Sequence, residues 1–116
     1  MYTVRSPAPN WRSNCGAQHQ EGTLLTFTTK LTVQAGQEQA FERMMCIAVP
    51  KVREEPGNHA YIFHRSTQDP RVFMLYEAYE DQAACEAHRA HLREMDMDLQ
   101  ALLDGPPIVE FYERLA

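Results

Sequence analysis

The stretch that decides the fold is residues 55–91, EPGNHAYIFHRSTQDPRVFMLYEAYEDQAACEAHRAH. Its opening Pro56-Gly57 predicts a tight turn, because neither residue continues a helix or a sheet. Two apolar runs follow, over residues 59–65 and 72–79, and both are typical of buried strands. Asp69-Pro70 makes the link between them a hairpin loop rather than a crossover. The stretch therefore predicts a turn and a two-stranded hairpin that leads into a helix.

Upstream of this hairpin the sequence predicts one more strand and one more helix. Residues 23–33 (TLLTFTTKLTV) alternate in polarity, which is typical of a strand with one apolar side. From Gln37 onward, apolar residues recur every three or four positions, as in an amphipathic helix. Pro50 should kink or end the first part of this helix, because it cannot donate to the carbonyl of Cys46.

Downstream of the hairpin, Asp81 is a suitable cap for a second helix. An apolar stripe runs from Ala84 through Leu102 or Leu103, which predicts one long helix that ends at Gly105. Residues 108–115 (IVEFYERL) close the chain as a last strand. The order is β-α-β-β-α-β, so the predicted fold class is α+β, with the ferredoxin-like arrangement.

The two strands of the hairpin are apolar on both faces, although a domain with two helices has enough cover for only one face of its sheet. The other face needs a partner, and a second copy of the chain is the simplest one. The sequence thus predicts a homodimer.

Length and composition limit the possible partners and compartment. The 116 residues suit one domain, over residues 22–116, preceded by a flexible arm over residues 1–21 or a segment that packs through Trp11. A net charge of −5 without a basic cluster argues against nucleic acid, and no apolar run is long enough for a membrane span or signal peptide. Three cysteines without a CxxC pair indicate reduced thiols and a cytoplasmic protein, with Cys46 and Cys85 as small core residues.

Two histidines one helical turn apart, His88 and His91, are the sharpest chemical feature. Both fall on or beside the stripe that should face the sheet. A histidine there is either a structural donor or a base with a shifted pKa. No metal site is predicted, because Glu94, the nearest third ligand, lies well round the helix from His88.

Glu77 stands in an apolar strand, where a carboxylate needs a partner. That partner could be Arg65 on the neighbouring strand or a histidine of the second helix. With Arg65 the pair would only clasp the sheet or the dimer. With a histidine, the carboxylate would orient an imidazole and raise its basicity.

The remaining candidates are aromatic or polar side chains near the hairpin. Tyr61 and Tyr79, like Phe63 and Tyr76, fit a core but could also line a cavity for a flat aromatic ligand. Asn58 suits the turn, although its amide could also reach a ligand oxygen. Phosphate-binding glycine loops, nucleophile elbows and zinc spacings are absent from the sequence, so no cofactor is predicted.

These features occur in a recognisable series. EPGN, Y-x-x-x-R, the DP hairpin, F-x-x-YE-x-Y-x-D-x-x-A, AH, LLDGPP and YERL follow one another from residue 55 to residue 115. The series resembles the antibiotic biosynthesis monooxygenase (ABM) domain, including its YgiN-like quinol monooxygenases, over about residues 22–115. The resemblance implies a ferredoxin-like subunit that pairs into a dimeric α/β barrel.

The resemblance also implies a reaction. Family members oxidise small phenols, anthrones or quinols with O2 and without a cofactor; a base removes the phenolic proton and the substrate anion then reduces O2. Glu77 and His88 match the YE and AH motifs, so they are the expected catalytic residues, and Tyr61, Arg65, His91, Asn58 and Tyr79 the expected substrate contacts. Two alternatives stay open: an isomerase of a small keto compound on the same scaffold, and a dimer that binds a small molecule without catalysis.

Overall fold

The computed structural model describes residues 23–97 and 99–116, so the predicted arm over residues 1–21 lies outside the described part. Strands β1 (Leu25–Thr32), β2 (Asn58–Arg65), β3 (Val72–Tyr79) and β4 (Ile108–Tyr112) form one antiparallel sheet in the order β2-β3-β1-β4. Helices α2 (Glu38–Arg53) and α3 (Gln82–Glu94) connect them, and the short 3-10 helix η1 (Leu99–Ala101) precedes β4. This is the predicted β-α-β-β-α-β order, and the ferredoxin-like fold is confirmed.

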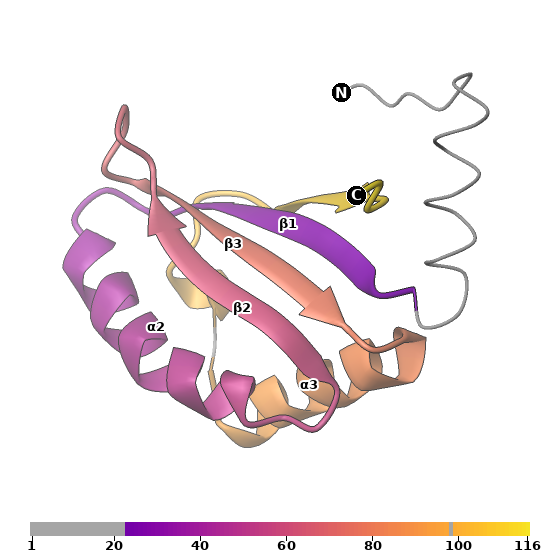
Figure 1. Cartoon of the computed structure of the whole chain (residues 1–116). Coiled ribbons are helices and arrows are strands. Elements are labelled where there is room, and N and C mark those ends of the chain that lie inside the picture. The colour runs from indigo at the N-terminus through magenta and orange to yellow at the C-terminus, as the bar shows by residue number, and fades with distance from the viewer. Residues whose placement is uncertain (1–22, 98) are drawn as a thin grey trace.

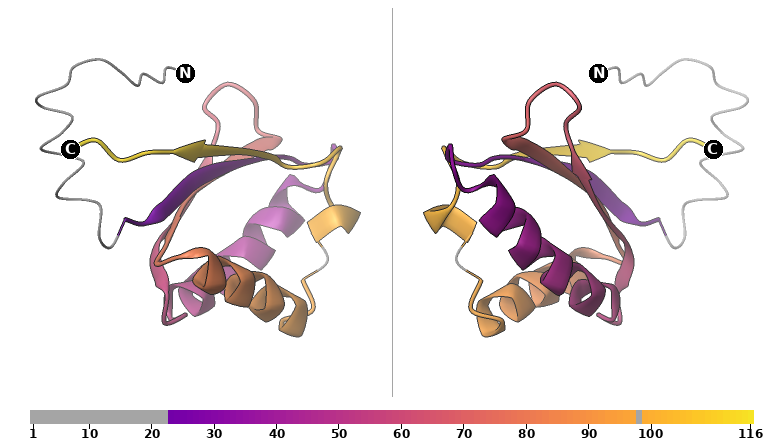
Figure 2. Two further views of the ribbon diagram at one scale, coloured as in Figure 1. Left: turned by 90° about the vertical axis from the view of Figure 1, so that its right-hand side faces the viewer. Right: turned by 90° about the vertical axis from the view of Figure 1, so that its left-hand side faces the viewer.

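The sheet and the helices form two layers (Figure 1). Both helices lie on the same side of the sheet, and in the two side views β4 extends past them (Figure 2). In register, Phe27 of β1 lies between Glu77 of β3 and Phe111 of β4, so these three side chains point to the helix side. None of the described helices is long and apolar enough to cross a membrane.

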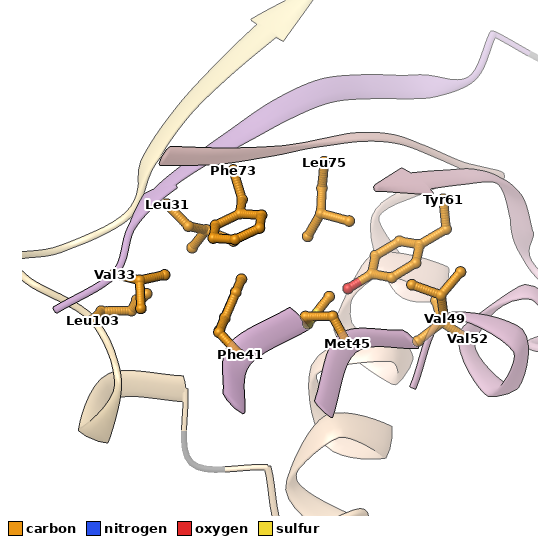
Figure 3. Close-up of a cluster of buried hydrophobic side chains, with 10 residues drawn as sticks. All are labelled: Leu31, Val33, Phe41, Met45, Val49, Val52, Tyr61, Phe73, Leu75 and Leu103. Carbon is orange, nitrogen blue, oxygen red and sulfur yellow. The ribbon is translucent and has the colours of Figure 1, made fainter. Parts of the chain in front are cut away.

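The main hydrophobic core lies between α2 and the strands β1, β2 and β3. Phe41 of α2 is fully buried, and its ring packs against Phe73 of β3 and Phe63 of β2 at centroid separations of 5.0 and 6.0 Å. Figure 3 shows ten buried side chains that converge from both layers, Leu31, Val33, Phe41, Met45, Val49, Val52, Tyr61, Phe73, Leu75 and Leu103. The helix-side residues of the alternating strands therefore form the core, as the sequence patterns predicted.

Two details of the helices differ from the prediction. Helix α2 does not end at Pro50 but continues to Arg53. Pro50 leaves one carbonyl, that of Cys46, without a backbone donor, and both residues lie on the exposed side of the helix, where water can take its place. Cys46 also lies on this exposed side, so its predicted core position is wrong, whereas Cys85 is buried as predicted.

The predicted single long helix after Asp81 is also wrong. Asp81 does cap α3, because its side chain accepts from the amide of Ala84 at 2.9 Å, but the helix ends at Glu94. Asp96 then adopts the left-handed conformation (φ 58°), which aspartate tolerates better than most residues, and the amide of Met97 donates to Leu92. Leu99 and Leu102 still pack on the core, but from η1 and the turn after it.

Gly57 lets the start of β2 approach the start of α3. A Cβ at Gly57 would lie 2.3 Å from the Cβ of Ala84, which is too short for any carbon contact. We expect Gly57→Ala to lower the free energy of unfolding by about 1–3 kcal/mol, since this methyl group must push α3 away. Urea unfolding measures the change. Gly36→Ala is the control, because Gly36 has open space around it and only its φ of 90° penalises a side chain. A smaller loss in Gly57→Ala than in Gly36→Ala would contradict the close approach.

Candidate active site

His88 is one of the two buried residues of α3, and it projects from that helix towards the sheet. Its Nδ1 lies 3.1 and 3.0 Å from the two carboxylate oxygens of Glu55. Because an ionised carboxylate only accepts, Nδ1 carries the proton and donates it, and the neutral ring then has a lone pair on Nε2. The local structure thus fixes both the orientation and the tautomer of the imidazole.

Glu55 reaches His88 from the turn between α2 and β2. The turn is held by backbone bonds from the amide of Glu55 to Val52 and from the amide of Asn58 to Glu55. The carboxylate of Glu55 also accepts from Nδ1 of His91 at 2.6 Å. The side chain of Glu55 is 11% exposed and that of His91 is 32% exposed. The trio of His88, Glu55 and His91 therefore extends from the interior to the surface. One carboxylate therefore holds both predicted histidines.

Glu77 faces the other nitrogen of the same ring. Its Oε1 lies 4.0 Å from Nε2 of His88. This distance is too long for a hydrogen bond, but a small movement of either side chain would form one. The hydroxyl of Thr29 donates to Oε2 at 2.7 Å, and the hydroxyl of Tyr79 donates to Oε1 at 3.3 Å. The buried carboxyl of Glu77 is thus positioned by β1 and β3 beside the unprotonated nitrogen of His88.

Burial shifts the pKa values of Glu77 and His88 in the directions that favour the uncharged form of each group. Loss of solvent raises the pKa of Glu77 to about 7, and the nearby Glu55 adds to this, while the hydrogen bonds from Thr29 and Tyr79 oppose it. Loss of solvent lowers the pKa of His88, and the contact with Glu55 opposes that shift. Near neutral pH the site therefore holds a carboxyl that readily carries a proton and an imidazole that readily lacks one.

Two tyrosine rings enclose the imidazole. The ring centroids of Tyr61 and Tyr79 lie 5.4 and 5.2 Å from that of His88. Burial and the adjacent Glu77 carboxylate raise the pKa of both tyrosine hydroxyls, which keeps them protonated as hydrogen-bond donors. The imidazole thus lies among buried aromatic side chains, and this burial favours its neutral form.

The structure brings together five of the seven residues predicted for the site, namely Glu77, His88, His91, Tyr61 and Tyr79. Arg65 lies elsewhere: its guanidinium pairs with Glu42 and lies 5.2 Å from the centre of the Phe73 ring. The suggested pair between Arg65 and Glu77 is therefore wrong. Asn58 serves its turn, because its side-chain amide donates to the carbonyl of Ala60 at 3.1 Å.

Sequence reasoning missed Glu55 and Thr29. Glu55 precedes Pro56-Gly57, and an acidic residue before a turn suggests a solvated side chain. The signal that could have found it was two inward-facing histidines without an assigned acceptor. Thr29 interrupts the apolar face of β1 between Phe27 and Leu31, and a polar residue at such a position often serves a buried partner. The role of orienting the imidazole, which was predicted for Glu77, belongs in this geometry to Glu55, whose carboxylate accepts from Nδ1 of His88.

A groove of about 930 Å3 lies beside the trio, between the end of α2 and the start of α3. Glu55 and His91 form part of its floor, and Ala83, Ala84 and Ala87 form one wall. Within residues 23–97 and 99–116, no three histidine, cysteine or acidic side chains converge in a way that could hold a metal ion.

The raised pKa of Glu77 predicts a specific dependence of stability on pH. A carboxyl whose pKa is about 7 when folded and 4.5 otherwise binds more protons in the folded state, so its contribution to stability falls as pH rises from about 4.5 to about 7. His88 has a lowered pKa and acts in the opposite direction below pH 6.5. The test therefore compares the free energies of unfolding of a Glu77 variant and the unchanged protein at each pH, because the contribution of His88 is common to both.

We expect the free energy of unfolding of Glu77→Gln, relative to the unchanged protein, to rise by roughly 2–3 kcal/mol between pH 5 and pH 8. Glutamine keeps the shape of the side chain but carries no charge at pH 8. Chemical unfolding at both pH values measures the difference, and the exposed Glu86→Gln is the control. A difference for Glu77→Gln that does not change with pH would contradict the buried, proton-sharing carboxyl.

The sequence and the fold can be compared with known proteins. The family model for antibiotic biosynthesis monooxygenase matches residues 25–93, which include the hairpin and nearly all of α3. No curated protein matches the chain significantly.

Solved structures show the same fold, and one of them carries the same family name. A protein from Nitrosomonas europaea, provisionally assigned as an antibiotic biosynthesis monooxygenase, is 25% identical, with 82% of this chain and 93% of that chain covered and a TM-score of 0.74. PA3566 from Pseudomonas aeruginosa is 29% identical, with 80% and 95% covered and a TM-score of 0.72. Rv0793 from Mycobacterium tuberculosis, at 19% identity, with 80% and 96% covered and a TM-score of 0.71, is similar in fold. The chain belongs to the antibiotic biosynthesis monooxygenase family.

Proposed function

We propose that this protein is a cofactor-independent monooxygenase that oxidises a small phenolic, anthrone-type or quinol substrate with O2. The observation that carries the proposal is the imidazole of His88, whose Nδ1 is held by Glu55 and whose free Nε2 faces Glu77 between two tyrosine rings. A nitrogen base with a fixed tautomer in a largely apolar site is suited to removing a proton from an acidic hydroxyl or methylene group.

The proposed reaction balances without a further reductant. Nε2 of His88 takes a proton from the substrate, and the negative charge of Glu55 stabilises the imidazolium that forms. The substrate anion transfers its electrons to O2, which forms a carbon–peroxide bond. Loss of water then leaves a carbonyl, so that CH2 and O2 become C=O and H2O. The carboxyl of Glu77 is suited to protonate the leaving peroxide oxygen, because its pKa is about 7.

The quinol monooxygenase type within the family fits the same geometry. The rings of Tyr61 and Tyr79 lie beside the base, with centroids 5.4 and 5.2 Å from that of the imidazole, and aromatic side chains suit a flat diphenol. Their protonated hydroxyls, like the Glu77 carboxyl, would contact the substrate oxygens. We therefore propose naphthoquinols and related hydroquinones as the first substrates to test.

An oxygen electrode tests this function directly. The protein is mixed with a naphthoquinol or an anthrone in air-saturated buffer, and O2 uptake is followed together with the product mass. The expected result is enzyme-dependent O2 uptake with incorporation of one atom from 18O2 into the product. Failure of all electron-rich phenols, anthrones and quinols would contradict the proposal.

One observation favours a second candidate, an isomerase of a small keto compound. Glu77 and His88 are two proton carriers with oppositely shifted pKa values on one site, which is also what enolisation and reprotonation require. Turnover of a keto substrate under strict anaerobiosis, with exchange of its α-proton into D2O, would favour this reaction over oxygenation.

We also propose that the protein is a homodimer built on the outer face of the sheet. On that face the exposed large apolar side chains come from three strands: Ile62, Tyr76, Ile108 and Tyr112. No described helix covers them (Figure 2). Large apolar side chains exposed on one sheet face, here with Thr28 and Lys30 of β1 among them, are often buried by a partner, and a second copy presents the same surface.

We expect Tyr76→Asp to convert the dimer to a monomer, because a charge at the centre of this face cannot be desolvated without a partner. Light scattering coupled to size-exclusion chromatography gives the mass. Ile47→Asp is the matched control, since Ile47 is 64% exposed but lies on α2, away from the sheet. Equal masses for the two variants would contradict the proposed interface.

A further inference from the structure

The groove beside the candidate active site is not used by the proposed reaction. It has a volume of about 930 Å3, an apolar wall formed by Ala83, Ala84 and Ala87, and Pro56 at the turn. Its size is in the range of pockets that bind compact ligands or anchoring side chains. The hydrogen-bonded pair of Glu55 and His91 forms part of its floor, and His91 is the member of the site trio that reaches the surface.

The rim of the groove is acidic. Glu54, Glu80 and Asp81 are among the residues that line it, and Lys51 is the single lysine or arginine among them. Glu80 is already paired with His59, whereas Glu54 makes only backbone bonds among those found in the structure. An apolar wall with an acidic rim favours an occupant that carries an apolar anchor next to a positive charge.

A segment of this chain has that chemistry. Residues 1–22 contain two arginines and a single acidic residue, Glu21, although the whole chain has a net charge of −5. Trp11 and Arg12 stand next to each other in this segment, so an aromatic anchor is followed directly by a positive charge. Tryptophan and arginine are both enriched among the residues that anchor protein interfaces.

The described chain begins at the edge of the groove. Leu25, the first residue of β1, pairs with Tyr79 of β3, and the next two residues after Tyr79, Glu80 and Asp81, belong to the groove rim. The chain between Trp11 and Thr23 spans up to about 40 Å when extended, at about 3.3 Å per residue. The tether is therefore long enough, and it holds Trp11 at a high effective concentration near the groove.

We propose that the N-terminal segment docks into this groove, with Trp11 against the alanine wall and Arg12 beside Glu54. The occupant is a segment of the same chain, so the interaction does not depend on protein concentration. It also does not depend on the reaction that the site performs.

Trp11 is the only tryptophan in the chain, so its fluorescence reports on the full-length protein directly. We expect blue-shifted emission and slow quenching by acrylamide, both independent of protein concentration. Ala87→Arg and Ala83→Arg should shift the emission to the red and increase the quenching constant at least about twofold, because a long cation then fills the groove. Ala101→Arg, an exposed alanine on η1, should change neither quantity.

A charge exchange tests the pairing of Arg12 with Glu54. Arg12→Glu and Glu54→Arg should each expose Trp11, and the double variant should restore the protected emission. Circular dichroism and thermal unfolding confirm that each variant is folded. Exposed Trp11 in the unchanged protein would overturn the proposal. A protected Trp11 whose emission does not change in Ala87→Arg and Ala83→Arg would also overturn it, because Trp11 then packs elsewhere. So would a Trp11 that becomes exposed on dilution, because it then packs on a second copy.

Discussion

His88→Ala is expected to lower kcat/KM for the oxygenation of a quinol or anthrone by about 10²–10⁴-fold, the usual contribution of a general base. The reason is the position of Nε2, which is free of protons, faces the site and has no substitute nearby in the described structure. Glu77 cannot replace it efficiently below pH 7, because burial raises the pKa of Glu77 to about 7 and the carboxyl is then largely protonated. Steady-state O2 uptake measures the change.

The matched control is His64→Ala. His64 lies on the exposed side of β2, where it contacts the carbonyl of Met74, and no part of the proposed mechanism uses it. His88→Ala should retain its fold, as judged by circular dichroism, although it leaves Glu55 with one imidazole partner instead of two. Equal rates for His88→Ala and the unchanged protein would remove His88 from the mechanism.

Glu55→Ala is expected to lower kcat/KM by about 10–100-fold and the free energy of unfolding by about 1–3 kcal/mol. Both effects have one cause, because this carboxylate accepts hydrogen bonds from His88 and His91 at once. Without it the tautomer of His88 is no longer fixed and the imidazolium loses its counter-charge. Glu55 acts through His88 rather than on the substrate, so it is a positioning residue.

The pH profile distinguishes positioning from a merely structural role. The base must be neutral to act, so activity falls as pH drops through the pKa of His88. Glu55 raises that pKa against the effect of burial, so its removal should move the acid limb of kcat/KM to lower pH. Glu55→Gln should show the same displacement with a smaller loss of stability. The exposed Glu86→Ala is the control, and an acid limb that stays in place in both Glu55 variants would contradict the positioning role.

The fold could be predicted from the sequence because its signals are local. Alternation in β1, the Asp-Pro hairpin and the Asp81 cap each specify a short element, and their order alone gives the ferredoxin-like topology. The end of α3 was missed because the apolar stripe continues beyond it. Asp96 ends the helix through a left-handed backbone conformation, which side-chain periodicity does not reveal.

The candidate site was predicted only in part, for a physical reason. His88, Glu77, Tyr61 and Tyr79 share the helix side of known elements, so their convergence follows from strand and helix periodicity. Glu55 belongs to a turn, and the direction of a turn side chain depends on tertiary contacts such as the close approach of Gly57 to Ala84. The interpretation that placed Arg65 near Glu77 was wrong because Tyr61, not Arg65, is the residue of β2 that lies opposite Glu77. Arg65 lies four residues from Tyr61, about 13 Å at 3.3 Å per residue, and pairs with Glu42 instead.

The central claim is that His88 presents an unprotonated Nε2 to the site because Glu55 holds its Nδ1 proton. Two-bond 15N–1H correlation spectra of imidazole-labelled protein at pH 7.5 read this tautomer directly. The claim predicts that His88 has its proton on Nδ1 and that adding a naphthol selectively shifts the His88 Nε2 resonance with saturation, while His64 is unaffected. A proton on Nε2 would contradict the claim, as would a His88 Nε2 resonance that does not shift at a saturating concentration of the naphthol.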